Sequence, residues 1–183
     1  MSAANYGQLV IAFLAAGLVA AAWGWSRLGT RIWVPGALAM LAAAAVVAAV
    51  PAEVTVEGRG GRAALVALAG ALGVVGGGPV TARVFALVDR GETTAQSMDR
   101  AGQVLRGGAW IGALERAAIF ASLVAGWPEG LAVVLALKGL GRYPELRAAE
   151  DGVRTGAAER FIIGTFTSVL WAAACAAVVV LVD

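Results

Sequence analysis

The stretch GAWIGALERAAIFASLVAGWPEGLAVVLALKGLGRYPEL, Gly108 to Leu146, decides the fold. Two long apolar runs flank the turn signal Trp127-Pro128-Glu129-Gly130, and this pattern predicts two membrane helices joined by a tight turn. Glu115, Arg116 and Lys138 interrupt the apolar runs. Charged side chains are costly within membrane helices and usually face the interior of a bundle. We therefore expect a functional site on this hairpin.

The whole chain is too apolar for a soluble domain. Of its 183 residues, 60% are hydrophobic and 14% are charged, whereas a soluble domain carries about a quarter charged residues. The net charge of +2 is small and the arginines are scattered, which argues against nucleic-acid binding. The composition predicts an all-α polytopic membrane bundle that forms one domain, residues 1–183, and has the lipid bilayer as its main partner.

Apolar runs of about 18 residues or more are long enough to cross a bilayer. The first run follows an uncharged start without the basic segment of a signal peptide, so we interpret it as a spanning helix that is not cleaved. The fifth run is short, and Tyr143-Pro144 is expected to end it. Six spans are predicted: residues 8–25, 33–50, 63–88, 107–126, 131–142 and 157–182.

The third span contains Gly76-Gly77-Gly78-Pro79, which we expect to break the helix, because glycine is flexible and proline lacks a backbone donor. Two interpretations stay open. The helix is discontinuous and its second half, from Pro79, directs N–H groups at a ligand. Alternatively, the helix ends near Val75 and an interfacial helix follows from Pro79 to Arg90.

Three polar segments are expected outside the spans. Residues 51–62 and 145–156 carry charges and glycines and are predicted to be loops. Residues 91–106 are the most polar stretch, and Thr93 with Gln96 fits a capping box. This segment is predicted to be a short amphipathic helix, which either lies on the membrane or connects two spans.

The distribution of arginines predicts the orientation. The segments 26–32, 89–107 and 142–160 share one side of a six-span bundle and hold nine arginines, whereas the other side holds Arg59 and Arg62. Because basic loops stay in the cytoplasm, we expect a multi-pass protein of the bacterial inner membrane with both termini outside.

In this topology the intramembrane charges lie in the cytoplasmic half. We expect Glu115 to face Lys138, and Glu159 to lie near Arg116 or Arg83, because a buried charge without a partner loses its charged form. Such pairs would hold three helices in register or form a site for an ion, a small anion or a relayed proton. The candidate pathway residues are therefore Glu115, Lys138, Glu159, Arg116 and Arg83.

The sequence offers no candidate for catalysis, metal binding or a cofactor. It contains no histidine, which removes the commonest general base and transition-metal ligand. The single cysteine, Cys175, lies within the last apolar run and is interpreted as a small buried hydrophobic residue.

Three segments near the carboxyl terminus resemble a family of bacterial multi-pass membrane proteins of unknown function. The segments Ile111–Arg116, Ala136–Leu146 and Ala158–Ser168 are similar, in the same order, to the family patterns IGxLER, AAKSxxRFxEL and AEYxLIGTxxS. The resemblance covers roughly the last 75 residues. Gly139 replaces a serine of the pattern and Arg160 replaces an aromatic residue. The resemblance implies a bacterial membrane protein and implies no activity.

The leading hypothesis is a small transport protein or channel subunit with a site for an ion or a small anionic solute. A chain of 183 residues is short for such a protein, so we expect a homo-oligomer. The alternatives are an accessory subunit of a larger membrane complex, in which the charges only hold helices in register, and the membrane substrate-binding subunit of an importer. A lipid-modifying enzyme is less favoured, because histidine and a repeated acidic motif are missing.

Overall fold

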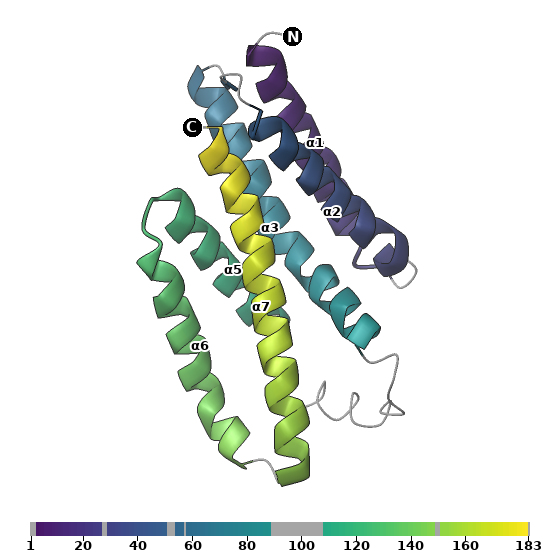
Figure 1. The fold of residues 1–183 in the computed structure, drawn as a ribbon, viewed down its shortest axis with the longest axis vertical. Coiled ribbons are helices and arrows are strands. Elements are labelled where there is room, and N and C mark those ends of the chain that lie inside the picture. Colours follow the sequence, from purple (N-terminus) through teal and green to yellow (C-terminus); the bar gives the residue numbers. More distant parts are fainter. Residues whose placement is uncertain are drawn as a thin grey trace.

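The computed structural model describes residues 3–26, 29–50, 54–56, 58–88, 108–148 and 151–182. Within these ranges the protein is all-α and forms a bundle of helices (Figure 1). The helices are α1 (Ala3–Trp23), α2 (Gly29–Ala48), α3 (Gly58–Val88), α5 (Gly108–Val124), α6 (Glu129–Ala148) and α7 (Asp151–Leu181).

Four of these helices, α1, α2, α3 and α7, are long and apolar enough to cross a membrane. The hairpin of α5 and α6 lies beside α7 (Figure 1). Both termini lie at the upper end of the bundle in this view, α6 finishes and α7 begins at the lower end, and α3 finishes partway down. Each predicted span overlaps one helix, so the predicted all-α membrane bundle is confirmed.

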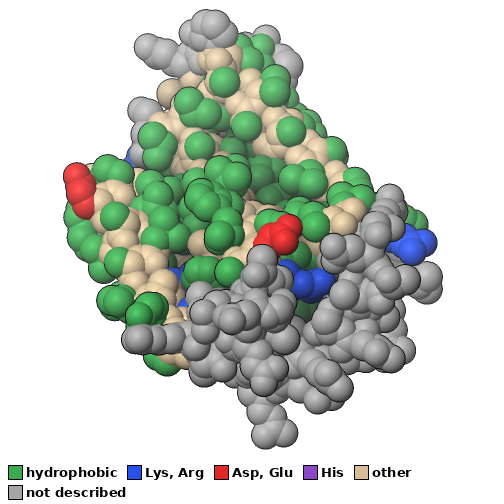
Figure 2. Space-filling model, turned by 60° about the horizontal axis from the view of Figure 1, so that its bottom comes forward, with side chains coloured by type: hydrophobic (Ala, Val, Ile, Leu, Met, Phe, Trp, Pro, Cys, Tyr) green, Lys and Arg blue, Asp and Glu red, His purple; other side chains and the backbone are tan. Residues whose placement is uncertain are grey.

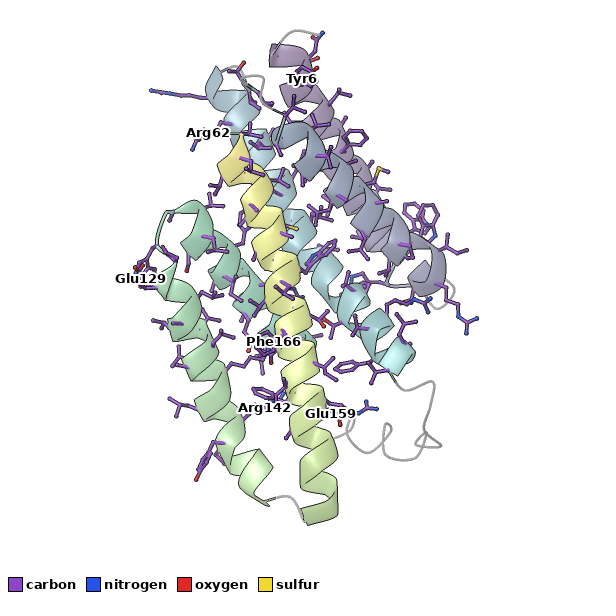
Figure 3. The ribbon with its side chains drawn as sticks, in the orientation of Figure 1. Tyr6, Arg62, Glu129, Arg142, Glu159 and Phe166 are labelled. Atoms are coloured by element: carbon purple, nitrogen blue, oxygen red, sulfur yellow. The ribbon has the colours of Figure 1, made fainter. Side chains whose placement is uncertain are left out.

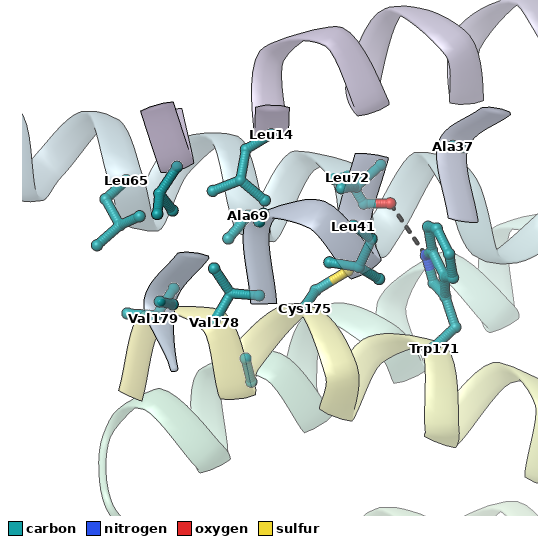
Figure 4. Packing of buried hydrophobic residues seen from close by; sticks show 14 of the residues in the cluster. Leu14, Ala37, Leu41, Leu65, Ala69, Leu72, Trp171, Cys175, Val178 and Val179 are labelled. Atoms are coloured by element: carbon teal, nitrogen blue, oxygen red, sulfur yellow. Dashed lines mark hydrogen bonds between the residues drawn. The ribbon is translucent and has the colours of Figure 1, made fainter. Parts of the chain in front are cut away.

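Helices α1, α2, α3 and α7 share a core of small and branched side chains (Figure 4). Leu14, Leu72 and Val178 are fully buried in it. A Cβ atom on Gly73 would lie 3.6 Å from the Cβ of Cys175, in ordinary van der Waals contact, so α3 and α7 pack against each other at this level. Cys175 is buried and carries a free thiol, in agreement with its interpretation as a packed hydrophobic residue.

The expected break in the third span is wrong. Helix α3 runs without interruption from Gly58 to Val88, with Pro79 inside it. Helix α3 begins at Gly58, before the predicted start of the span at residue 63. Residues 58–62 of the predicted loop 51–62 are therefore helical. Residues 54–56 have no regular secondary structure, and Val54 among them is buried rather than on the surface.

The expected helix end at Tyr143-Pro144 is also wrong, because α6 continues through Pro144 to Ala148. Proline removes the donor for the carbonyl of Leu140, but Leu140 and Gly141 are exposed, so that carbonyl can tilt away from the helix. Most of the predicted loop 145–156 is therefore helical, and α7 already begins at Asp151. The predicted turn after α5 is present, and Gly126 adopts a φ of 71° there. The amphipathic helix predicted over 91–106 lies outside the described residues.

Candidate functional site

Helix α3 stays continuous at Pro79 because a side chain replaces the missing donor. Proline has no N–H, so the carbonyl of Val75, four residues earlier, loses its helical hydrogen bond. The indole Nε1 of Trp25, just after α1, donates to this carbonyl at 3.0 Å. An unpaired carbonyl is expensive in a membrane interior, and this hydrogen bond satisfies it.

Two further carbonyls of the same turn accept hydrogen bonds from other helices. Arg116 of α5 donates to the carbonyl of Val74 through Nε at 3.0 Å and Nη2 at 2.8 Å. Trp171 of α7 donates from Nε1 to the carbonyl of Leu72 at 3.1 Å (Figure 4). The side chains of three other segments thus converge on one turn of α3.

The three consecutive glycines make room for these three donors. A Cβ atom on Gly76 would lie 2.5 Å from the ring of Trp171, and one on Gly77 would lie 2.3 Å from Cδ of Arg116. A Cβ atom on Gly78 would lie 2.7 Å from the ring of Trp25. All three distances are shorter than real Cβ contacts. The glycines therefore allow close packing within a helix, and the predicted ligand-directed N–H groups are not needed to explain them.

A double-mutant cycle tests the pairing of Trp25 with Pro79. Trp25→Phe should lower the free energy of unfolding by about 1–3 kcal/mol, because it leaves the carbonyl of Val75 without a donor. In the Pro79→Ala background the same substitution should cost much less, since the new backbone N–H can bond this carbonyl. The measurement is denaturant unfolding of the four proteins in detergent. Equal costs in both backgrounds would contradict the assignment.

Arg116 is the most deeply buried charge among the described residues. Its exposed fraction is 5%, and it lies in the middle of α5 against Gly77. Besides the carbonyl of Val74, it donates from Nη1 to Oγ of Ser168 on α7, at 3.3 Å. Both partners are uncharged, and within the described residues Arg116 has no ion pair.

Glu115 and Lys138 form the predicted pair, which joins α5 to α6. Their side chains are 14% and 19% exposed, so the pair is largely shielded from solvent. Glu115 and its neighbour Arg116 are not hydrogen-bonded to each other, since Arg116 donates to Val74 and Ser168 and Glu115 accepts from Lys138. The three residues together carry one excess positive charge.

The other two predicted pathway residues do not join this cluster. Glu159 is exposed near the lower end of α7, below the level of Phe166 (Figure 3), and neither it nor Arg83 makes an ion pair with another described residue. The expected ion pair of Glu159 with Arg116 or Arg83 is therefore not formed. For Arg116 the reason is register, because Arg116 contacts Ser168, more than two helical turns beyond Glu159. Arg160 lies over the ring of Phe85 at 5.6 Å.

The surface seen from the lower end of the bundle carries both charged and hydrophobic side chains. Figure 2 shows an acidic group beside basic side chains near the middle of this face, with hydrophobic side chains above it. No group of three His, Cys, Asp or Glu residues that could hold a metal ion occurs in the described ranges. The N–H groups of Arg116 itself are donors, from which an anion can accept hydrogen bonds and to which a metal ion cannot bind.

Two threonines that the sequence reasoning missed lie at the same interface. The Oγ1 atoms of Thr81 on α3 and Thr165 on α7 are buried and have no hydrogen-bond partner in the described structure. Helical spacing in the sequence could have indicated them. Thr81 lies four residues after Gly77 and Thr165 lies three residues before Ser168, so each threonine shares a helix face with a residue of the site.

No family model, curated protein or solved structure matches this chain.

Proposed function

We propose that this protein is a small membrane transport protein or channel subunit, with a site for a small anionic solute or ion around Arg116, Glu115 and Lys138. The observation that supports this proposal is the state of Arg116, a buried guanidinium that is bonded to a carbonyl and a hydroxyl. Arginine keeps its charge even in such surroundings. An anion bound there would neutralise it.

The charge balance supports an anion over a cation. Moving an ion out of water costs several kcal/mol unless a counter-charge compensates it. The only carboxylate of the cluster, Glu115, is paired with Lys138, so a bound cation would add to an existing positive excess. A bound anion would remove that excess.

The proposed site faces the cytoplasm of a bacterial cell, with both termini outside the inner membrane. The support is the arginine content of segments 26–32, 89–107 and 142–160, which a six-span topology puts on one side of the membrane, nine against the two of the other side, together with the retention of basic segments in the cytoplasm. We propose a homo-oligomer, because one chain contributes few helices around a pathway.

The test is solute flux into liposomes that contain the purified protein. Lys138→Met and Glu115→Gln should each reduce the flux of the transported anion at least tenfold, a cost of about 1.4 kcal/mol or more. Lys138→Met leaves the Glu115 carboxylate without its partner, so that it repels an anion, and Glu115→Gln leaves two cations that hold a bound anion too tightly for release. The double variant should be more stable than either single variant, since neither Glu115 nor Lys138 is then left as a charge without its partner. Normal flux in both single variants would contradict the proposal.

The second candidate function is an accessory subunit of a larger membrane complex. The observation that favours it is the packing of Arg116 against α3, which joins three helices regardless of any ligand. This function predicts that the substitutions destabilise the protein and that the purified chain alone transports nothing. Co-purification with a second membrane protein would favour it.

A further inference from the structure

We propose that the ligand is a small monovalent anion, held by N–H groups of Arg116 together with the hydroxyls of Thr81 and Thr165. This inference rests on the proposed function, because it names the ligand class of the same site. It is carried by a separate observation, the two buried hydroxyls without a partner.

The two hydroxyls lack the bond that threonine and serine usually make within a helix. A buried hydroxyl in a helix normally donates to the carbonyl four residues earlier. Thr167 does so, to the carbonyl of Ile163 at 2.8 Å, and Ser122 does so, to the carbonyl of Ala118 at 2.8 Å. Thr81 and Thr165 make no such bond. Their hydroxyl protons are therefore available to another acceptor.

Helix register places both hydroxyls on the same side of Arg116. Helices α3 and α5 run antiparallel, with Gly77 against Arg116 and Gly73 near Phe120. One turn further along α3, Thr81 is therefore level with Gly112, one turn earlier on α5. A Cβ atom on Gly112 would lie 3.0 Å from Nη1 of Arg116, so the guanidinium extends toward this level.

Helix α7 brings Thr165 to the same level. Cγ2 of Thr81 lies 3.7 Å from the position of a Cβ atom on Gly164, the residue before Thr165. Ser168, which accepts a hydrogen bond from Arg116, lies about one turn further along α7. Three helices thus bring a cation and two donor hydroxyls to one level of the bundle.

The donors and the charge define the ligand class. Arginine has five N–H donors, and the bonds to Val74 and Ser168 use three of them. Together with the hydroxyls, the remaining donors suit a small acceptor with a charge of −1, such as chloride or nitrate. A divalent anion would reverse the charge excess of the cluster and leave an uncompensated negative charge.

The experiment measures the stability of the full chain in detergent while chloride replaces gluconate at constant ionic strength. A ligand that binds the native state raises the melting temperature. We expect chloride to raise it in a saturable way that depends on Thr81 and Thr165, and sulfate at the same ionic strength to raise it only by its general exclusion from the protein surface, equally in all variants. Thr81→Val and Thr165→Val should each weaken the apparent chloride affinity at least about tenfold, because each removes a hydrogen bond to a charged group.

Thr167→Val is the matched control, since its hydroxyl bonds its own helix, and it should keep the affinity of the native protein. Thr81→Ser and Thr165→Ser retain the hydroxyl and should also keep the chloride affinity of the native protein. A loss of affinity in the valine variants alone is then due to the missing donor and not to poor folding. A stabilisation by sulfate that both valine variants lose, or an unchanged chloride response in both valine variants, would overturn the inference.

Vesicle flux separates this inference from the proposed function. Chloride binding that depends on both threonines, without flux of chloride or nitrate into vesicles, would support the anion site and contradict transport. Solute flux that both valine variants retain in full would support transport and contradict the role of the hydroxyls.

Discussion

Replacing Gly76 with alanine is expected to lower the free energy of unfolding by about 2–4 kcal/mol, from forced repacking together with a lost hydrogen bond. The new methyl group would lie 2.5 Å from the ring of Trp171. That ring is 4% exposed and donates to the carbonyl of Leu72. An indole is rigid and this one is packed on all sides, so it cannot give way without breaking the hydrogen bond. The measurement is denaturant unfolding in detergent, followed by tryptophan fluorescence.

Gly139→Ala is the matched control on another helix. Gly139 lies within α6, and no heavy atom comes within 4 Å of its Cβ position. Alanine is favoured over glycine in a helix by about 0.5–1 kcal/mol, so this substitution should stabilise the protein slightly. The same chemical change is thus expected to have opposite signs at the two sites. A neutral effect of Gly76→Ala would show that α3 and α7 are not in close contact.

A second substitution refines the same prediction. Trp171→Phe puts a smaller ring opposite Gly76, at the cost of the bond to Leu72. In the Trp171→Phe background, Gly76→Ala should therefore cost at least about 1 kcal/mol less than in the native protein. Additive effects would mean that the two residues do not interact.

The sequence predicts most of the fold because the determinants of membrane helices are local. Apolar runs of bilayer length stand out in a single chain, and all six predicted spans overlap helices. The pairing of Glu115 with Lys138 was predictable for a related reason, since two buried opposite charges on adjacent helices stabilise each other. Helix ends were less predictable, because α6 and α7 extend beyond their apolar parts through residues that local rules assign to turns or loops, such as Pro144 in α6 and Gly152 and Gly156 in α7.

The continuity of α3 through Gly76-Gly77-Gly78-Pro79 was not predictable, because it depends on contacts with residues distant in sequence. Local rules predict a break. Trp25, at the end of the first predicted span, supplies the donor for the carbonyl that Pro79 leaves without its helical partner. Its partner Val75 is 50 residues away, and nothing in the sequence specifies that pairing. The partners of Arg116 on α3 and α7 lie beyond local reasoning for the same reason.

Replacing Arg116 with methionine is expected to abolish anion flux, with a loss of at least 100-fold, because truncating a buried charged binding group costs about 2–5 kcal/mol. The free energy of unfolding should change by less than about 1 kcal/mol. Methionine fills a similar volume, and the lost bonds to Val74 and Ser168 are offset by removal of a buried charge whose desolvation is costly. Flux is measured in liposomes, and stability is measured in detergent.

Arg116→Lys separates charge from geometry. Lysine keeps the positive charge, but it lacks the planar fork with which Arg116 bonds Val74 and Ser168. If an anion is the ligand, Arg116→Lys should retain part of the flux that Arg116→Met loses, because the charge still attracts it. If Arg116 only joins helices, lysine and methionine should both destabilise the protein by about 2 kcal/mol or more through the lost bonds. In that case neither variant would affect anion binding. We therefore compare the anion flux of the two variants with their free energies of unfolding. This comparison distinguishes a binding site from a structural contact.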